Sequence, residues 1–290
     1  MGHNHNHNHK TSSSNSNVMI AFLLNFSFAI IEILGGILTN STAIISDAVH
    51  DFGDSIALAT SFVLERLSRK KESDSYTYGL KRLTLIGAFI NIAVLTFGTY
   101  YVLTNAIEGF INPEPIKASG MLGLAILGIA VNGISVFRMK GSKNILDKSV
   151  LMHLMEDFLG WVAVLIVSLV MLYTEWYRLD SVLSFIIAII IIKNIYSNIK
   201  SALIIMLQAN PDKQLYYKIK EAILQIQGVE EIIECNFWTL DGENHVFTAR
   251  VKINNSQEYN AILHAIKDIL DENEIHRHTI EMLLKEEEEG

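Results

Sequence analysis

The sequence predicts a membrane protein in two parts: an all-α bundle of six transmembrane helices, followed by a C-terminal α+β cytoplasmic domain. Half of the 290 residues are hydrophobic, the mean hydropathy is +0.29 and there are only three prolines. That composition is too apolar for an ordinary soluble domain. Basic residues also gather in alternate connections between the apolar stretches, and the chain after residue 211 is strongly acidic.

Six apolar stretches each have roughly the 20 residues that a helix needs to cross a bilayer. They cover residues 18–38, 43–66, 83–107, 119–138, 152–173 and 180–206. The second and fifth are the weakest, because each contains ionisable side chains. Residues 1–17 are polar and show no cleavable signal peptide.

The distribution of Lys and Arg predicts the topology. The 66–82 connection has six basic residues and the 138–148 connection has four. The 39–42 connection has none, and the 109–118 and 174–179 connections have one each. This alternation predicts a multi-pass protein with both termini in the cytoplasm.

The N-terminal tail, residues 1–17, is of low complexity and is expected to be disordered. It carries His3, His5, His7 and His9. Alternating imidazoles can capture Zn²⁺, Ni²⁺ or Cu²⁺ loosely, so we expect weak metal capture in which no single histidine is essential. The alternatives are an engineered tag or a dispensable tail.

The six-helix domain is expected to cover residues 18–208 and the cytoplasmic domain residues 209–290, since Pro211 disfavours helix in the residue before it. The second domain alternates helical and strand periodicity, with a hairpin signal at Asp241-Gly242. The predicted elements are a helix at 212–227, strands at 229–239 and 245–253, a helix at 256–273 and a strand at 278–284. This αββαβ order resembles a small ferredoxin-like domain.

Charge and cysteine content exclude several functions. Residues 212–290 carry eight basic and seventeen acidic side chains, a formal net charge of −9. This argues against a nucleic-acid partner and is typical of a solvated domain that tolerates cations. Cys235 is the only cysteine, which excludes an intrachain disulfide and a Cys-rich structural zinc site.

Two His/Asp pairs are the most informative residues of the chain: His50 with Asp54, and His153 with Asp157. A spacing of four residues puts each pair on one face of its helix. Ionisable groups at membrane depth are costly and usually mark an ion or proton path. One nitrogen and one oxygen ligand from each helix make a set that suits tetrahedral Zn²⁺. The alternative is hydrogen bonding between neighbouring helices.

Four further polar residues lie in or beside the apolar stretches. Asp47 is three residues before His50 and borders the same face. Asn25 and Glu32 lie in the first stretch and Asp180 begins the last. These four residues either line the ion path or support the metal ligands and the packing of the helices.

The chain lacks the common enzyme signatures. HExxH, GxSxG and the phosphate-binding GxxxxGK[ST] are all absent, so we expect no enzyme activity and no ATP-driven pumping. A membrane metalloenzyme ranks last, because its zinc would need an open coordination position that a four-ligand site does not leave.

Several segments resemble the cation diffusion facilitator family, which includes zinc transporters. The two HxxxD pairs are the most specific, and the other segments support them. The segments are NSTAIISDAVHDFGDS (40–55), YTYGLKRL (76–83), FINPEPI (110–116), LMHLMEDFLGW (151–161), RLDSVLS (178–184) and GVEEIIECNFWTLDG (228–242).

The resemblance implies a homodimeric metal–proton antiporter in which His50, Asp54, His153 and Asp157 surround one ion. We therefore expect a secondary transporter in a bacterial plasma (inner) membrane that exports Zn²⁺, with Cd²⁺ and Co²⁺ as further candidate substrates. Zinc is then a transported substrate and protons are the counter-ion. The alternative is a zinc-binding membrane sensor that binds the metal without net transport.

Overall fold

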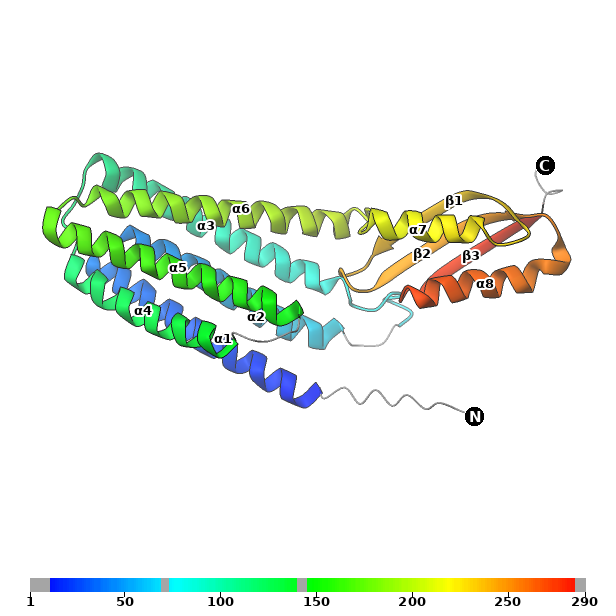
Figure 1. Ribbon diagram of the computed structural model, residues 1–290, viewed down its shortest axis with the longest axis horizontal. Coiled ribbons are helices and arrows are strands. Elements are labelled where there is room, and N and C mark those ends of the chain that lie inside the picture. Colours follow the sequence, from blue (N-terminus) through cyan, green and yellow to red (C-terminus); the bar gives the residue numbers. More distant parts are fainter. Residues whose placement is uncertain (1–10, 69–72, 140–144, 285–290) are drawn as a thin grey trace. The chain divides into compact units, whose positions relative to one another are not determined.

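Six long helices follow one another up to residue 206, where the sequence predicts six apolar spans (Figure 1). The computed structural model describes residues 11–68, 73–139 and 145–284. The helices are α1 (Thr11–Thr39), α2 (Thr42–Ser68), α3 (Leu83–Ile111), α4 (Ala118–Met139), α5 (Ile145–Thr174) and α6 (Arg178–Met206).

The start of α1 differs from the prediction. The helix begins at Thr11, so residues 11–17, which the sequence analysis assigned to a disordered tail, are helical. Once a helix is nucleated, each added residue gains a hydrogen bond. A polar segment joined to a long apolar helix can therefore extend it. The earlier part of the tail, with its four histidines, lies outside the described residues.

The chain divides into two compact units. The helical ends near residues 64–88 and 198–206 group with the C-terminal part rather than with the other helices. The first unit is Met1–Val63 with Phe89–Ser197, and the second is Leu64–Ala88 with Asn198–Gly290.

Hydropathy separates the helices into classes. In the described part of the chain, three helices are long and apolar enough to cross a membrane: Leu83–Ile111, Leu154–Thr174 and Arg178–Met206. Phe26–Thr39 and Ala118–Ile134 are shorter apolar segments. The helix α2 is not in either class, because its first half contains three aspartates and a histidine among its apolar residues.

Glycines let the helices of the first unit approach closely. A Cβ at Gly35 of α1 would lie 2.5 Å from Leu124 of α4, and one at Gly98 of α3 would lie 2.5 Å from Val49 of α2. Gly128 of α4 packs directly under the ring of Trp161 of α5, which is almost fully buried. Small residues serve this purpose in membrane bundles, where packing replaces the hydrophobic effect between helices.

Gly128→Ala is expected to lower the melting temperature of the detergent-solubilised protein by several degrees. The new methyl group would overlap the rigid Trp161 ring, and such overpacking costs about 1–3 kcal/mol. Gly123→Ala on the same helix is the matched control, because nothing lies within 4 Å of its Cβ position. The control should keep or slightly raise the melting temperature, since alanine favours helix over glycine. Equal shifts in both variants would contradict this packing.

The second unit contains a small mixed sheet, and its elements match the predicted order. They are α7 (Lys213–Leu224), β1 (Val229–Thr239), β2 (His245–Ile253), the short helix η1 (Ser256–Glu258), α8 (Tyr259–Glu272) and β3 (Arg277–Leu284). The strand order is β1-β2-β3, with β1 and β2 antiparallel and β2 and β3 parallel.

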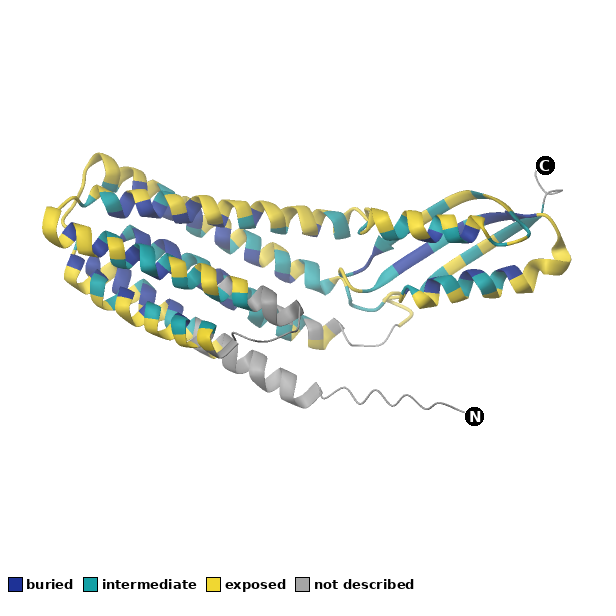
Figure 2. Cartoon of the chain, in the orientation of Figure 1, coloured by how far each residue is buried: buried dark blue, intermediate teal, exposed yellow. Residues whose placement is uncertain are grey.

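One apolar core joins this sheet to α7 and α8. Ile219 and Ile223 of α7 and Ile262 and Ile266 of α8 pack with Phe247 of β2. Figure 2 shows the buried positions along these helices and along β2. The amphipathic spacing that predicted both helices therefore faces the sheet.

The predicted hairpin between β1 and β2 is confirmed. The Leu240 amide donates to the Asn244 carbonyl at 2.9 Å, and Gly242 has a φ of +102°, which favours glycine. The Asp241 carboxylate accepts hydrogen bonds from the amides of Glu243 and Asn244.

Candidate metal centre

His50 and Asp54 lie together on α2, as their spacing predicts. The His50 Nε2 atom is 3.8 Å from Asp54 Oδ2, and the two side chains are 13% and 26% exposed. No Lys or Arg occurs between residues 18 and 65, so the pair has no basic neighbour in the sequence around it. The pair therefore forms a partly buried site that presents one nitrogen and one carboxylate to a metal ion.

The helix α5 runs antiparallel to α2. The amide of Thr42, in the first turn of α2, donates to the Asp180 carboxylate in the first turn of α6 at 2.7 Å. The helix α5 ends at Thr174, four residues before α6 begins at Arg178. The beginning of α2 and the end of α5 thus lie at the same end of the unit, which we call the capped end.

Asp47 fixes the level at which the two helices face each other. A Cβ at Gly160 of α5 would lie 3.8 Å from the Asp47 Oδ1 atom. Asp47 is 7% exposed and also interacts electrostatically with Asp157, one turn before Gly160. These contacts pair residue 47 of α2 with residue 160 of α5.

The Asp47–Gly160 register relates the positions of the two His/Asp pairs along the helices. Three residues after Asp47 is His50, and three residues before Gly160 is Asp157. Seven residues along in each direction are Asp54 and His153. Steps of three and seven residues return to nearly the same helix face. This register aligns the positions along the two helices, but the described side chains of His50, Asp54 and Asp157 do not gather into a group that could hold a metal ion.

The described side chains do not by themselves complete a metal site. Among them, no three His, Cys, Asp or Glu residues lie close enough to hold a metal ion. The side chain of His153 is outside the described ones, as is that of Asn25. His3, His5, His7 and His9 also lie outside the described residues.

Glu32 of α1 points toward the same region. It is fully buried, and its carboxylate lies within hydrogen-bonding reach of the Asp51 carboxylate. It interacts electrostatically with Asp51, Asp47 and Asp157. Carboxylates from α1, α2 and α5 thus surround a zone that favours cations or protons.

The sequence analysis did not single out Asp51, which lies one residue after His50 and therefore about 100° round the helix from it. Asp51 is 5% exposed and faces Glu32, so it belongs to the carboxylate zone. The available signal was Glu32 itself, because a buried acid in a neighbouring span needs polar surroundings. Asn91 of α3 was also missed, and its buried side-chain oxygen has no partner among the described residues.

Asp180, for which the sequence predicted a pathway or supporting role, caps α2. Its Oδ1 atom accepts from the Ser41 hydroxyl at 2.5 Å, and its Oδ2 atom accepts from the amides of Thr42 and Ala43 at 2.7 and 3.2 Å. A carboxylate at a helix N-terminus satisfies free amides and complements the helix dipole. Asp180 therefore fixes the helix that carries His50 and Asp54.

Asp180→Ala is expected to lower the melting temperature of the purified protein, because three buried donors lose their acceptor. The cost should be about 2–3 kcal/mol. Asp180→Asn should cost less, since its amide oxygen still accepts. Glu108→Ala, which removes an exposed carboxylate near the end of α3, is the control and should have little effect. A melting temperature of Asp180→Ala equal to that of the control would contradict the capping role.

A cavity of about 270 Å³ opens at the capped end. Its polar lining includes Asn40, Asn105, Glu108, Glu114 and Asp180. Oxygen ligands of this kind suit hydrated cations, so the end of the unit beyond Asp47 is compatible with the passage of a metal ion.

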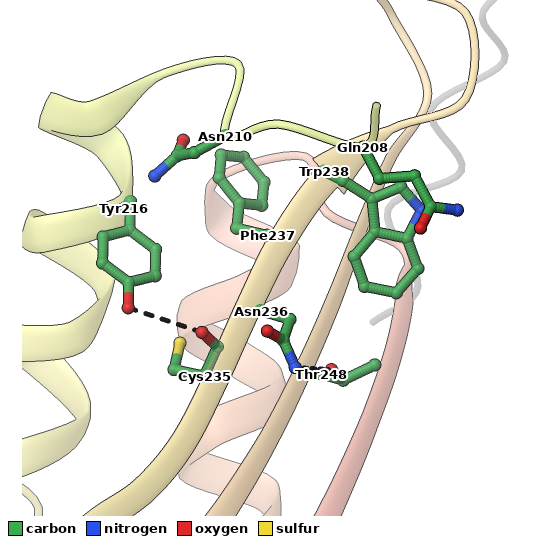
Figure 3. Close-up of a pocket in the computed structure, with 8 residues that line it drawn as sticks. All are labelled: Gln208, Asn210, Tyr216, Cys235, Asn236, Phe237, Trp238 and Thr248. Carbon is green, nitrogen blue, oxygen red and sulfur yellow. Dashed lines mark hydrogen bonds between the residues drawn. The ribbon is translucent and has the colours of Figure 1, made fainter. Parts of the chain in front are cut away.

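The second unit offers weaker metal ligands. Cys235 lies in a cavity of about 540 Å³ with Tyr216, whose hydroxyl donates to the Cys235 carbonyl at 3.4 Å (Figure 3). Burial raises the pKa of the Cys235 thiol, which disfavours the thiolate that binds metals. His276 lies 3.3 Å from the Asp271 carboxylate, and His278 lies 3.2 Å from the Ile275 carbonyl.

Comparisons with known proteins agree with this architecture. The family described as the Cation efflux transmembrane domain matches residues 18–207. The chain is 29% identical to the cadmium, cobalt and zinc/H(+)-K(+) antiporter of Bacillus subtilis, over 97% of this chain and 92% of that protein. It is 28% identical to the zinc transporter ZitB of Escherichia coli, over 91% and 86%. It is 29% identical to the metal cation efflux system protein CzcD of Cupriavidus metallidurans, over 80% and 74%.

Proposed function

Because the chain belongs to the cation efflux (cation diffusion facilitator) family, whose members are transporters and not enzymes, we propose that it exports Zn²⁺ from the cytoplasm in exchange for protons. The observation that supports the proposal is the approach of Asp47 of α2 to Gly160 of α5, which puts the helices that carry the two His/Asp pairs next to each other. Relatives named as zinc transporters and as a cadmium, cobalt and zinc antiporter support this substrate class, with Cd²⁺ and Co²⁺ as further substrates.

The proposed transport site consists of His50, Asp54, His153 and Asp157. The two imidazoles bind the ion as neutral nitrogen ligands. The two carboxylates supply two negative charges, which balance the charge of a divalent ion. Each level supplies one ligand of each kind, so α2 and α5 must approach for the ion to be held by all four. The carboxylates of Asp47 and Glu32 would attract the cation without belonging to the four-ligand set.

Proton exchange follows from the ligands themselves. Zinc binds neutral histidine and ionised aspartate, so binding displaces protons, and protons in turn compete with zinc. An unperturbed histidine pKa of about 6.5 places this competition near physiological pH. In the proposed cycle zinc loads from the cytoplasm, the bundle rearranges, and protons from outside release it by alternating access.

The remaining parts of the proposal concern architecture. We propose six membrane-spanning helices in a bacterial inner membrane with both termini in the cytoplasm, a ferredoxin-like C-terminal domain, and assembly as a homodimer. The alternation of basic connections supports the topology, and the αββαβ order supports the domain. The tail histidines would capture zinc weakly near the cytoplasmic entrance.

Zinc uptake into proteoliposomes is expected to follow an imposed pH gradient. With an acidic lumen that contains a zinc-sensitive dye, protons leaving the vesicle drive zinc inward. Each exchanged proton adds about a tenfold accumulation per pH unit. An ionophore that collapses the gradient is the control and should return uptake to the basal rate. Uptake that ignores the gradient would refute the coupling.

The second candidate function, a zinc sensor without net transport, is favoured by the acidic character of the second unit. It predicts zinc binding to the purified protein with no dye response in any gradient. The same proteoliposomes therefore separate the two functions.

A further inference from the structure

A second cavity of the C-terminal unit lies where two candidate membrane helices end. It measures about 430 Å³. Its lining combines aromatic rings with basic side chains: Tyr76, Tyr78, Lys81, Arg82 and Trp238. Gln208 lines it too, and Gln208 and Trp238 are also shared with the neighbouring cavity of Figure 3.

The basic side chains of this cavity are not neutralised within the described residues. Neither Lys81 nor Arg82 has a carboxylate within ion-pair distance there. The Lys81 ammonium group donates to the side-chain oxygen of Asn244, whose own amide is held by Asp241 at 2.7 Å. Lys81 is therefore held in place by a neutral partner and retains its charge for a ligand.

One of the aromatic rings of the cavity, Tyr78, is in contact with Arg277 of β3. The guanidinium of Arg277 is 5.8 Å from the centre of the Tyr78 ring. A cation over this ring holds the aromatic wall in position. Lys81 and Arg82 beside the rings of Tyr76, Tyr78 and Trp238 form a built site for an anion that also has an apolar part.

The chain places this cavity at the membrane surface. Arg82 directly precedes Leu83, where a candidate membrane helix begins, and Gln208 follows the last residue of another, Met206, by two positions. Tyr and Trp favour the interface between lipid and water, and Lys and Arg close to it bind anionic headgroups.

We propose that this cavity binds the phosphate of an anionic phospholipid headgroup, with Lys81 and Arg82 contacting the phosphate and the aromatic rings packing beside the glycerol and acyl chain. A soluble phosphate shares the charge but not the apolar part, so the lipid is the occupant that fits both halves of the lining. The proposal is independent of the metal site and of the direction of transport.

Tryptophan quenching in vesicles tests the proposal on the full-length protein. Brominated phosphatidylglycerol in phosphatidylcholine vesicles should quench more strongly than brominated phosphatidylcholine, and Trp238→Phe should remove the excess. Each basic residue near an anionic surface strengthens binding about fivefold, so Lys81→Gln with Arg82→Gln should weaken the phosphatidylglycerol effect about twentyfold. Lys220→Gln with Lys267→Gln, on α7 and α8, is the matched control of equal charge and should retain it.

The outcomes are distinct. Equal quenching by the two brominated lipids, or equal loss in both double variants, would overturn the site. Displacement of the quenching by inorganic phosphate or glycerophosphoglycerol would assign the cavity to a soluble anion and overturn the lipid. Persistence of the excess in the presence of both soluble anions supports it.

Discussion

Asp157→Asn is expected to reduce zinc transport in proteoliposomes at least about a hundredfold. The substitution keeps the size of the side chain but removes the negative charge that the divalent ion needs. Loss of a group that merely supports a metal ligand already costs about 10–100-fold in affinity or activity, so loss of a proposed ligand should cost no less. The measurement is the initial rate of dye response with an imposed pH gradient.

The control for this variant is Glu156→Gln. Glu156 is the acidic residue next to Asp157 on α5, and its side chain is exposed. The Glu156→Gln variant therefore loses the same charge, but away from the proposed site. Both variants should elute as the unmodified protein does on size exclusion and melt at similar temperatures. A transport rate in Asp157→Asn equal to that of Glu156→Gln would exclude Asp157 from the site.

The register between α2 and α5 predicts that cysteines at positions 54 and 153 can be cross-linked. In a Cys235→Ser background the protein has no thiol, so Asp54→Cys and His153→Cys introduce the only two. The proposed site requires these two positions to face each other, so Hg²⁺ or a mild oxidant should join them in most molecules. The product is detected by mass spectrometry of proteolytic fragments.

The matched pair is Asp54→Cys with Met155→Cys. Met155 lies only two residues from His153 but on the far face of α5, where it is 45% exposed. This pair should give little cross-linked product. Similar yields from both pairs would show that α5 does not present His153 to α2, and the four-ligand proposal would fail.

Local pattern was sufficient to predict most elements. The strands at 229–239 and 245–253 have the predicted bounds, because alternating apolar residues on both sides of Asp241-Gly242 define both strands and the turn. The His50–Asp54 contact follows from helix geometry alone. The polar start of α1 was predicted incorrectly because residues 11–17 have no apolar periodicity and continue a helix that the apolar residues form.

Contacts between helices could not be predicted from local pattern. Gly35 and Gly123 look alike in sequence, yet a Cβ at Gly35 would clash with Leu124 and one at Gly123 would meet nothing. Asp51 was not singled out from the sequence, because its neighbour Glu32 comes from another helix. Asp180 acts as an acceptor because the fold brings it next to the first amides of α2. The donor Thr42 lies 138 residues away in the sequence.

The bond between Asp180 and the first turn of α2 makes the capped end a pivot. When α2 tilts about that point, displacement grows with distance along the helix, which rises about 1.5 Å per residue. His50 is then a lever arm of about 12 Å from Thr42, and Asp54 one of about 18 Å. A small tilt therefore moves Asp54 farther from α5 than it moves His50. The first turn of α6 has to move with α2 whenever the bundle opens at the end away from Asp180.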